Sequence, residues 1–402
     1  MKPLRLAFNH TRLEFTGGVE GYIGNLLGYL LDRGHTVDFF GGKVGAQLTH
    51  PNFRLVRVPY LRSPRPLRVA SFARWSRRLI EREERVRPYD IVQGFSRTYY
   101  HTLYRDGSGC RQDFCELYLD RFVRRGLRKL YYGWNPVDRI VRRIEEKRYV
   151  ERPQRLVIAI SAFVRDQILR HYPVAPETVR VIYSGVDCER FHPRWRGAGR
   201  AKIAALLGGE EKLGARRVLA FVGNDYHRKG LDLVLEALAR RAARSAGYGP
   251  DPMLVVAGGD SRAVEYERRA VSLGLAGSAF FLGKRSDVPE ILAGADVLLL
   301  PSYFDAYANV SSEALASGTP VIASSTSGAS ELIRPSLGWV LPKNDVDSLL
   351  ATIESFHAVK DLEPMRAAAR TAALELSWDR HYREIEGIYE ELAASRKEER
   401  VR

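Results

Sequence analysis

The chain has 402 residues, 45% of them hydrophobic and 28% charged, which predicts a soluble protein with two or three domains of about 150 residues each. This balance excludes a disordered chain, a fibrous repeat and a disulfide-stabilised miniprotein, and no apolar run is long enough to cross a bilayer. The formal net charge of +15 favours polyanionic partners: an anionic membrane surface, acidic substrates or nucleic acid.

The cysteines and the N-terminus favour a reducing compartment. Cys110, Cys115 and Cys188 are too few for a disulfide framework, and their spacing is not that of a paired zinc site. The first ten residues turn polar too early for the core of a signal peptide. We therefore expect a cytoplasmic protein that associates peripherally with the inner face of the cytoplasmic membrane.

The first half of the chain alternates short apolar runs with amphipathic stretches, as a parallel sheet flanked by helices requires. We expect a strand at residues 4–8, a glycine-containing loop to residue 18 and a helix at residues 19–32. Arg33-Gly34 is typical of a helix C-terminus. Further strands are predicted at residues 36–40, 89–92, 155–160 and 179–183, with a helix at residues 162–170.

A basic stretch at residues 194–200 is predicted to connect this half to a second α/β series. The series consists of strands at 218–222, 253–257, 279–282, 297–300 and 321–323, a helix at 231–241 and a final helix at 380–396.

The pattern predicts two Rossmann-like doubly wound α/β domains facing a cleft. Residues 1–193 form the first, residues 194–378 form the second, and residues 379–402 form a helix that packs back on the first. Ligands of such sheets bind beyond the carboxyl ends of the strands, so we expect the chemistry in the loops there.

The most informative segment is the loop and helix after the strand at residues 297–300. Amide groups and the dipole at a helix start near residues 309–311 favour a diphosphate. Asp305 in the loop and Glu313 one turn into the helix suit the vicinal hydroxyls of sugar and ribose, because carboxylates accept two hydrogen bonds. The alternative is a turn aspartate and an exposed helix acid, but the strand–loop–helix context favours function.

This segment resembles the retaining GT-B nucleotide-sugar glycosyltransferases of group 1 (family 4), whose pattern is E-x7-E followed by a helix and G-x-P-V-I-A. Here the shorter Asp305 replaces the first acid, and Glu313 and residues 318–323 follow. The resemblance implies that Glu313 holds the ribose and that Asp305, as a catalytic residue, contacts the donor sugar. It also implies that five backbone amides hold the donor: those of Ala306, Tyr307, Ala308, Asn309 and Val310.

Two other stretches agree with this family. Residues 221–232 are similar to its segment ending in Lys-Gly, which implies that Lys229 neutralises the donor diphosphate with Arg228 assisting. The family's usual arginine is replaced here by Asn224. Gly17 and Gly18 look like the family's Gly-Gly turn, where the missing Cβ lets the backbone approach phosphate or acceptor.

The acceptor side is expected in the first half of the chain. Residues 100–111 form the candidate loop, which resembles an element of lipopolysaccharide-core glycosyltransferases. His101 and Asp106 are predicted there as catalytic residues that orient the acceptor. The alternative is a buried histidine and a turn aspartate.

The resemblance implies that no cofactor or metal is needed, because the departing nucleoside diphosphate is stabilised electrostatically and a donor phosphate oxygen helps to take the acceptor proton. Asp345-Val346-Asp347 is the only D-x-D motif, and it precedes an apolar helix that we expect it to cap.

The sequence therefore predicts a hexosyltransferase with a nucleotide-sugar donor and an acidic membrane-borne acceptor such as lipopolysaccharide core. UDP is the expected carrier, from its frequency in the family that the sequence resembles. The acceptor prediction rests on basic groups at residues 62–85, 121–129 and 139–148, although each group alone fits a solvated helix face. The alternatives are a phospholipid or small soluble acceptor, a non-catalytic nucleotide-sugar-binding protein, or a nucleic-acid-binding protein. Nucleic acid is not expected, since the motifs of known modules are absent.

Overall fold

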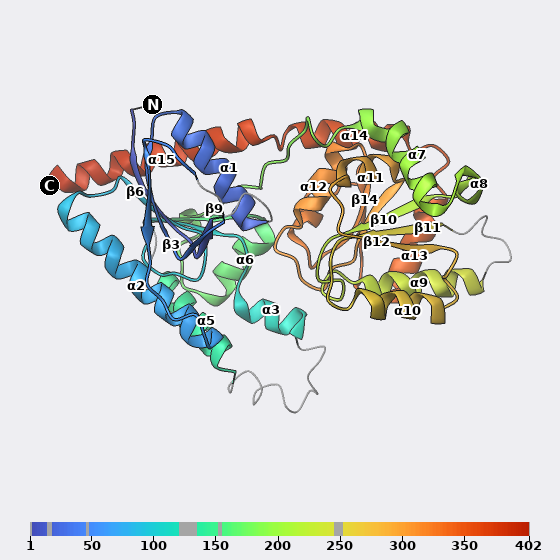
Figure 1. The fold of residues 1–402 in the computed structure, drawn as a ribbon, viewed down its shortest axis with the longest axis horizontal. Helices are drawn as coiled ribbons and strands as arrows, with labels where there is room; N and C mark the ends of the chain where they lie inside the picture. The colour runs from blue at the N-terminus through green and yellow to red at the C-terminus, as the bar shows by residue number, and fades with distance from the viewer. Residues whose placement is uncertain are drawn as a thin grey trace. The chain divides into compact units, whose positions relative to one another are not determined.

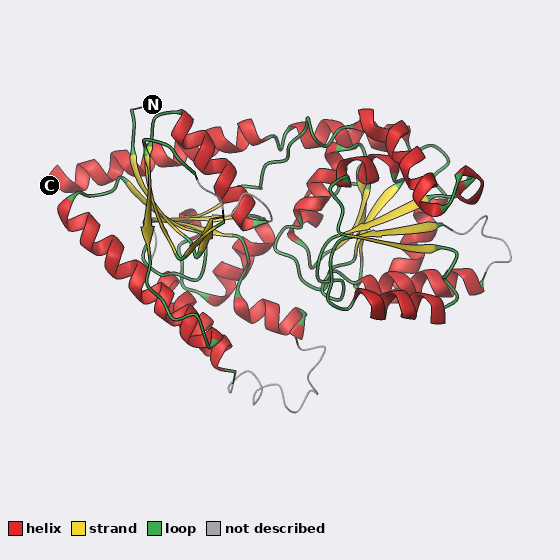
Figure 2. Ribbon diagram, viewed as in Figure 1, coloured by secondary structure: helices red, strands yellow, loops and turns green. Residues whose placement is uncertain are grey.

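The structure is a computed structural model that describes residues 2–13, 18–45, 48–119, 135–151, 155–244 and 252–401. The chain divides into two units: residues 1–183 together with 381–402, and residues 184–380. Each unit is a parallel sheet with helices on both faces (Figures 1 and 2). The sequence pattern placed the corresponding boundaries at residues 193 and 378.

The sheet of the N-terminal unit has seven parallel strands in the order β5-β3-β1-β6-β7-β8-β9. From β1 the chain first adds strands on one side and then on the other, so the topological switch point lies between β1 and β6. The strands are β1 (Arg5–Asn9), β3 (Thr36–Gly41), β5 (Phe53–Arg57), β6 (Ile91–Gly94), β7 (Leu103–Asp106), β8 (Leu156–Ala159) and β9 (Val179–Val181); the short β2 (Arg12–Leu13) and β4 (Lys43–Val44) pair separately.

The first helix, α1 (Val19–Asp32), has the predicted bounds because its apolar residues recur at helical spacing and face the core. It ends before Gly34, whose φ of +84° is the left-handed conformation expected from Arg33-Gly34. The other helices of this unit are α2 (Arg65–Val86), α3 (Arg111–Leu117), α5 (Pro136–Glu146), α6 (Ala162–His171) and α15 (Trp378–Val401).

From His381 on, helix α15 makes contacts within the N-terminal unit. The hydroxyl of Tyr29 donates to Glu386 at 2.8 Å, and the ring of Tyr29 stacks on Tyr382 with centroids 4.4 Å apart. Farther along the helix, Arg396 pairs with Glu84 of α2 at 2.5 Å. These contacts explain why residues 381–402 are grouped with a sheet formed nearly 200 residues earlier in the chain.

Replacing Gly387 with alanine is expected to stabilise the protein by about 0.5–1 kcal/mol, because Gly387 lies exposed inside α15 and its added Cβ meets no atom within 4 Å. The free energy of unfolding from urea titration measures this effect. The same substitution at Gly34 is the control, and there the positive φ should make alanine destabilising. Equal effects at the two positions would contradict the conformational explanation.

The sheet of the C-terminal unit has six parallel strands in the order β12-β11-β10-β13-β14-β15. The chain leaves β10 toward β11 and β12, then returns to β13 on the other side, so the switch point lies between β10 and β13. The strands are β10 (Val218–Val222), β11 (Met253–Ala257), β12 (Ala279–Gly283), β13 (Val297–Leu300), β14 (Val321–Ser324) and β15 (Gly338–Leu341).

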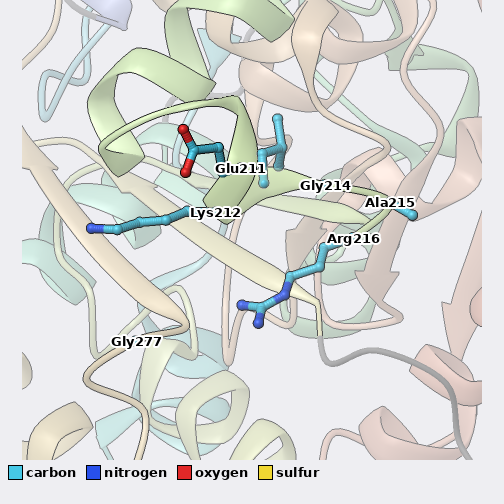
Figure 3. A pocket seen from close by; sticks show the side chains of 7 residues that line it. Glu211, Lys212, Gly214, Ala215, Arg216 and Gly277 are labelled. Carbon is cyan, nitrogen blue, oxygen red and sulfur yellow. The ribbon is translucent and has the colours of Figure 1, made fainter.

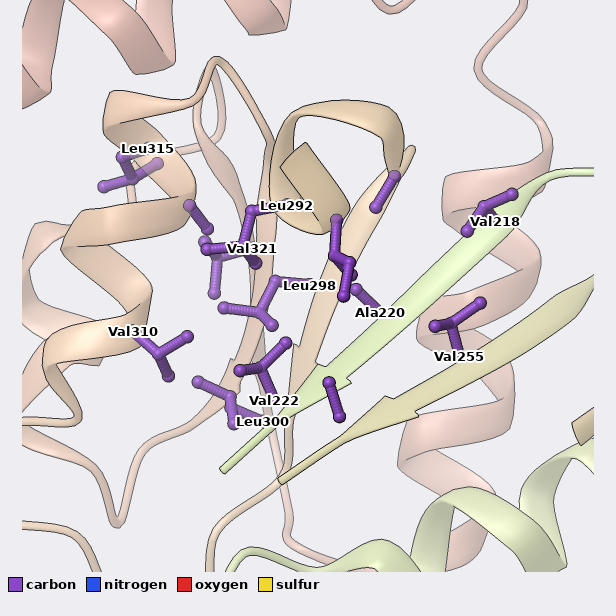
Figure 4. Close-up of a cluster of buried hydrophobic side chains, with 14 of the residues drawn as sticks. Val218, Ala220, Val222, Val255, Leu292, Leu298, Leu300, Val310, Leu315 and Val321 are labelled. Carbon is purple, nitrogen blue, oxygen red and sulfur yellow. The ribbon is translucent and has the colours of Figure 1, made fainter. Parts of the chain in front are cut away.

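The core of this unit lies between the central strands and the helices that follow them. Figure 4 shows Val222 and Leu300 from β10 and β13 on the side of Val310 in α12 (Asn309–Ala316), and Leu315 of the same helix on the side of Leu292. This packing fixes the start of α12 against the carboxyl ends of both strands. The remaining helices are α7 (Arg196–Leu207), α8 (Glu210–Leu213), α9 (Leu231–Ala243), α10 (Ala263–Ser272), α11 (Val288–Gly294), α13 (Val346–His357) and α14 (Glu363–Leu374).

The structure corrects two expectations about local structure. Residues 100–111 are not all loop, because residues 103–106 form β7, paired on both sides within the sheet. The predicted connection at residues 194–200 is helical from Arg196, and Gly199 lets α7 approach α11 closely, since a Cβ there would lie 2.0 Å from the carbonyl oxygen of Glu290. Strands β5 and β15 were not predicted. None of the described helices is both long enough and apolar enough to span a membrane.

Candidate active site

Two loops meet at the switch point of the C-terminal sheet. Residues 223–230 connect β10 to α9, and residues 301–308 connect β13 to α12. Because β10 and β13 are parallel neighbours, both loops leave the same edge of the sheet. The amide of Tyr303 donates to the carbonyl oxygen of Arg228 at 2.8 Å, which joins the loops directly. The sequence-predicted residues Arg228, Lys229 and Asp305 thus come together.

An ion cluster forms where the loops meet. One carboxylate oxygen of Asp305 accepts from Lys229 Nζ at 2.9 Å and from Arg228 at 3.1 Å. Arg228 also donates to the carbonyl oxygen of Phe304 at 2.9 Å and pairs with Asp225 at 3.0 Å. Burial favours the protonated form of Asp305, but the charges of Lys229 and Arg228 outweigh it and hold the pKa of Asp305 well below its usual value. Asp305 is therefore a carboxylate at neutral pH.

The other oxygen of Asp305 shapes the loop itself. It accepts from the amide of Ala308 at 2.9 Å and from the amide of Tyr307 at 3.3 Å. Two of the five amides predicted to hold the donor are therefore bonded to Asp305. The amides of Asn309 and Val310 lie in the first turn of α12, where a helix has no earlier carbonyl of its own to accept from them. The helix start offers donors there.

Both loops contain a non-glycine residue in the left-handed region. Asp225 has φ +59° and Ala308 has φ +58°, and in the described part of the chain no other non-glycine residue has a positive φ. Such conformations cost about 1–2 kcal/mol each and persist where the surrounding structure imposes them. Their occurrence on the two loops of one switch point supports a functional role for this edge.

Glu313 lies one turn inside α12, and its carboxylate differs from that of Asp305. Burial raises the pKa of Glu313 to about 7, although Arg190 and Lys229 oppose the shift. The pKa of Asp305 is thus lowered and the pKa of Glu313 is raised. Shifted pKa values of this kind are common at functional sites. Arg190 was not predicted from the sequence, since it lies before residue 194 and only the fold brings it toward α12.

The raised pKa of Glu313 gives a pH prediction for stability. The folded-state pKa of about 7 exceeds the ordinary value of 4.5, so Glu313 contributes favourably at low pH and this contribution is lost as pH rises through 7. Relative to Glu313→Gln, the wild type should lose about 2 kcal/mol between pH 5 and 8, a value reduced for partial exposure. Urea denaturation of both proteins measures the difference. A difference that does not vary with pH would contradict the shifted pKa.

The acceptor-side candidates lie in the N-terminal unit. Asp106 ends β7, and its carboxylate accepts from the amides of Ser108 and Gly109 at 3.0 Å each and from the hydroxyl of Tyr149 at 2.7 Å. His101 is buried, and its Nε2 lies 2.6 Å from Thr98 Oγ1. These contacts give both residues a role in shaping the loops, and the predicted catalytic role of each stays a prediction.

The predicted glycine turn is only partly within the described residues. Gly18 precedes α1 as its N-cap, whereas Gly17 lies outside the described part. Near this turn, neither ring nitrogen of the buried His10 has a hydrogen-bond partner among the described residues, and its Nε2 is 3.8 Å from Glu20. His10 was not predicted from the sequence, although its place directly after the first strand was a usable signal.

The D-x-D motif acts as expected for a helix cap. Asp345 is the N-cap of α13 and accepts from the amide of Ser348 at 2.8 Å. Among the described residues, no group of three or more His, Cys, Asp or Glu side chains has a metal-binding arrangement. The prediction that no metal is needed remains an expectation.

A pocket in the C-terminal unit lies away from this site. It is lined by residues 211–216 and Gly277, which lead into β10 and β12 at the amino ends of the strands (Figure 3). Ligands of parallel α/β sheets bind at the opposite, carboxyl edge. The candidate site is therefore the edge formed by the loops of β10 and β13.

Comparison with known families covers both units. The model of "Glycosyltransferase Family 4" matches residues 16–190, and the model of "Glycosyl transferases group 1" matches residues 209–374. The second match contains both loops of the candidate site.

Two of the relatives with similar sequences represent different named activities. The D-inositol 3-phosphate glycosyltransferase of Saccharomonospora viridis is 31% identical over 63% of this chain and 59% of the relative, so the match spans less than two thirds of that protein. The MMP alpha-(1->4)-mannosyltransferase of Mycolicibacterium hassiacum is 25% identical over 94% of this chain and 95% of the relative.

Solved structures show the same fold. WaaG, a glycosyltransferase involved in lipopolysaccharide biosynthesis, superposes with a TM-score of 0.73 at 22% identity, covering 96% of this chain and 98% of that one. HepE of Anabaena, in complex with UDP-glucose, has a TM-score of 0.68 at 17% identity, covering 96% and 100%. The chain therefore belongs to the group 1 and family 4 glycosyltransferases and has their GT-B fold, with a family 4 domain followed by a group 1 domain.

Proposed function

We propose that the protein is a retaining glycosyltransferase that transfers a hexose from UDP-hexose to an acidic, membrane-borne glycan such as lipopolysaccharide core. The observation that carries the proposal is the meeting of Lys229 and Arg228 at the switch point of the C-terminal sheet, beside the start of α12, where the charge of Lys229 also acts on Glu313. Two cations and a helix N-terminus suit a diphosphate, and the carboxyl group of Glu313 can form hydrogen bonds with ribose hydroxyls.

The chemistry follows from this arrangement. Breaking the bond between sugar and diphosphate leaves negative charge on the departing UDP, which Lys229 and the amides of Asn309 and Val310 stabilise. A donor phosphate oxygen takes the proton of the acceptor hydroxyl, so that the proposal requires neither a protein base nor a metal ion. UDP as the carrier is supported by the related fold of HepE, whose structure contains UDP-glucose.

An acidic acceptor is supported by the exposed face of α2 in the N-terminal unit. The acids of this helix are engaged: Glu81 pairs with Arg77, and Glu83 pairs with Arg54. The exposed cations that remain on one face of the helix are Arg68, Arg74, Arg78, Arg82 and Arg85. Trp75 is 41% exposed among them.

We infer that this face holds the enzyme at an anionic membrane surface, each arginine contributing about 1 kcal/mol near the lipid. The predicted basic group at residues 121–129 lies entirely outside the described residues. Flotation with anionic and neutral vesicles tests the inference, because reversing the charge of Arg78, Arg82 and Arg85 should abolish binding to the anionic vesicles alone.

A small phosphorylated acceptor in solution is the second candidate. It is favoured by the similarity to a relative named D-inositol 3-phosphate glycosyltransferase. A phosphorylated polyol shares its negative charge with a lipopolysaccharide core, and both suit a basic acceptor domain. Turnover with a soluble inositol phosphate but not with bacterial glycolipid would favour this candidate.

The proposal is tested by incubating the purified chain with UDP-, GDP- and ADP-hexoses, with and without chelator, and measuring release of the nucleoside diphosphate. We expect hydrolysis or transfer with the UDP donor alone, insensitive to chelator and lost in Glu313→Ala. Added glycolipid extract should accelerate release. Absence of turnover and of donor binding under both conditions would overturn the proposal.

A further inference from the structure

Three arginines lie at the carboxyl edge of the sheet in the N-terminal unit. Arg97 is in the loop after β6, Arg111 begins α3 after β7, and Arg65 begins α2 after β5. These strands are parallel, so the segments that follow them leave the same edge of the sheet. Ala73 of α2 and Tyr99 of the loop belong to one buried cluster, which holds α2 against the loop that carries Arg97.

Arg97 is a half-buried cation that no acid neutralises. It forms no hydrogen bond or ion pair with any residue that the structure describes. Burial lowers the pKa of Arg97, and the charges of Arg111 and Arg65 lower it further, against a smaller opposing effect of Glu145. A guanidinium that is partly removed from water without a counter-ion destabilises the free protein. An anion bound at this place would remove that cost.

The acids near the arginines have other partners. The buried Asp138 accepts from Nε of Arg111 at 2.6 Å. Glu145 accepts from the amide of Arg111 at 3.2 Å and from the hydroxyl of Tyr172 at 2.8 Å. Burial raises the pKa of Glu145 to about 7, so its carboxyl group is only partly ionised at neutral pH. The positive charge of Arg97 is therefore left for a ligand.

The loop that carries Arg97 is fixed before any ligand binds. Arg148 donates from Nε to the carbonyl oxygen of Thr98 and from Nη2 to that of Ser96, at 3.0 Å each. The guanidinium of Arg148 is buried and lies 3.6 Å from the ring centroid of Tyr104 in β7. These bonds hold the backbone on both sides of Arg97. A placed arginine loses less conformational entropy on binding than one on a free loop.

We propose that Arg97, assisted by Arg65 and Arg111, binds a phosphate group of the acceptor. A guanidinium can donate two parallel hydrogen bonds to phosphate oxygens, and two further cations strengthen the attraction for a dianion. This inference rests on the proposed function and deepens it, because it names a group that the acceptor carries and the residues that recognise it. A lipid-linked glycan and a small soluble ester can both supply the phosphate.

The direct test is a phosphorus-31 NMR titration of the chain with inorganic phosphate at low ionic strength and saturating UDP. UDP fills the proposed diphosphate site, so that the phosphate reports on other cations. Affinity should fall about 10–100-fold in Arg97→Gln, since hydrogen bonds between charged groups are lost. Arg65 is exposed, and Arg65→Gln should cost about 2–5-fold. No binding by the wild type, or equal binding by Arg97→Gln, would overturn the inference.

Arg87→Gln is the matched control. Arg87 follows α2 and precedes β6, so it lies at the amino edge of the sheet, and its side chain is exposed. The substitution removes the same charge from the same unit, and phosphate affinity should stay within about twofold of wild type. A loss as large as that in Arg97→Gln would show that net charge is being measured, which would overturn the assignment of the site.

Thermal unfolding separates a binding role of Arg97 from a structural one. Because no acid pairs with this arginine, Arg97→Gln should unfold at the wild-type temperature or above it in phosphate-free buffer with saturating UDP. Added inorganic phosphate should then raise the unfolding temperature of the wild type and not that of the variant. A variant that unfolds well below the wild type, or does not fold, would make Arg97 structural and overturn the inference.

Initial rates identify the source of the phosphate. The acceptors are bacterial glycolipid extract, the same extract after enzymatic dephosphorylation, and a soluble inositol phosphate. For Arg97→Gln, KM should rise about 10–100-fold with the phosphorylated acceptor that the enzyme uses, while kcat changes less, because the phosphate does not react. An equal rise with the dephosphorylated extract would overturn the inference. A wild type that binds inorganic phosphate through Arg97 but releases no nucleoside diphosphate from any donor would refute the proposed function alone.

Discussion

Replacement of Lys229 with methionine is expected to lower kcat/KM for the nucleotide sugar by about 100-fold, equivalent to about 2.7 kcal/mol of transition-state stabilisation. The methionine keeps the length and apolar stem of the side chain but removes the charge that meets the diphosphate. Since the charge on the departing UDP grows in the transition state, kcat should fall as well as affinity. Initial rates across a range of UDP-hexose concentrations separate the two.

Lys212→Met is the control for this substitution. Lys212 is exposed on α8 beside the pocket at the amino ends of the strands, away from the candidate site (Figure 3). The variant has lost the same charge from the same unit, so kcat/KM should stay within about twofold of wild type. A Lys229→Met enzyme with wild-type turnover would remove the basis of the proposed diphosphate site.

Gly230→Ala is expected to destabilise the C-terminal unit by about 3–5 kcal/mol. The Cβ of alanine would lie 2.1 Å from the carbonyl oxygen of Pro301, and the φ of +80° is unfavourable for any residue with a Cβ. The loops after β10 and β13 touch through this backbone, so the substitution forces them apart. Thermal unfolding followed by circular dichroism measures the loss, and a donor-binding assay should show that affinity falls with it.

Gly277→Ala tests the same substitution where no clash is expected. Gly277 lies in the C-terminal unit, and its added Cβ meets no atom within 4 Å. The free energy of unfolding should therefore change by less than about 0.5 kcal/mol. If Gly230→Ala changed the free energy of unfolding equally little, the two loops could move apart without loss of stability. The close approach at Gly230 would then not be needed for the site.

Several elements could be predicted because their signals are local. The strands β10, β11 and β13 have the bounds expected from their apolar runs, and α1 has the bounds expected from its helical spacing and the Arg33-Gly34 end. Each of these strands is central in its sheet and buried on both faces, so its whole run is apolar. The apolar run by itself is then sufficient to predict the bounds of the strand.

The elements that were missed have weaker local signals. β5 and β15 are edge strands whose burial is partial, so their patterns are mixed. β7 contains the buried polar residues Arg105 and Asp106, which a sequence pattern assigns to a loop. Their burial is satisfied by partners distant in the chain, for example Tyr149 for Asp106, and such pairing is decided by tertiary contacts.

The sequence by itself determined the family, the α/β class and the chemical types at the donor site, because motif spacing, apolar periodicity and charge are properties of neighbouring residues. It also placed Arg228, Lys229, Asp305 and Glu313 on loops and a helix start that follow strands. Only the tertiary structure decided how these side chains are used. Lys229 and Asp305 are 76 residues apart and meet because β10 and β13 are neighbours in the sheet, where Asp305 pairs with Lys229 and Arg228 and accepts from two amides of its own loop.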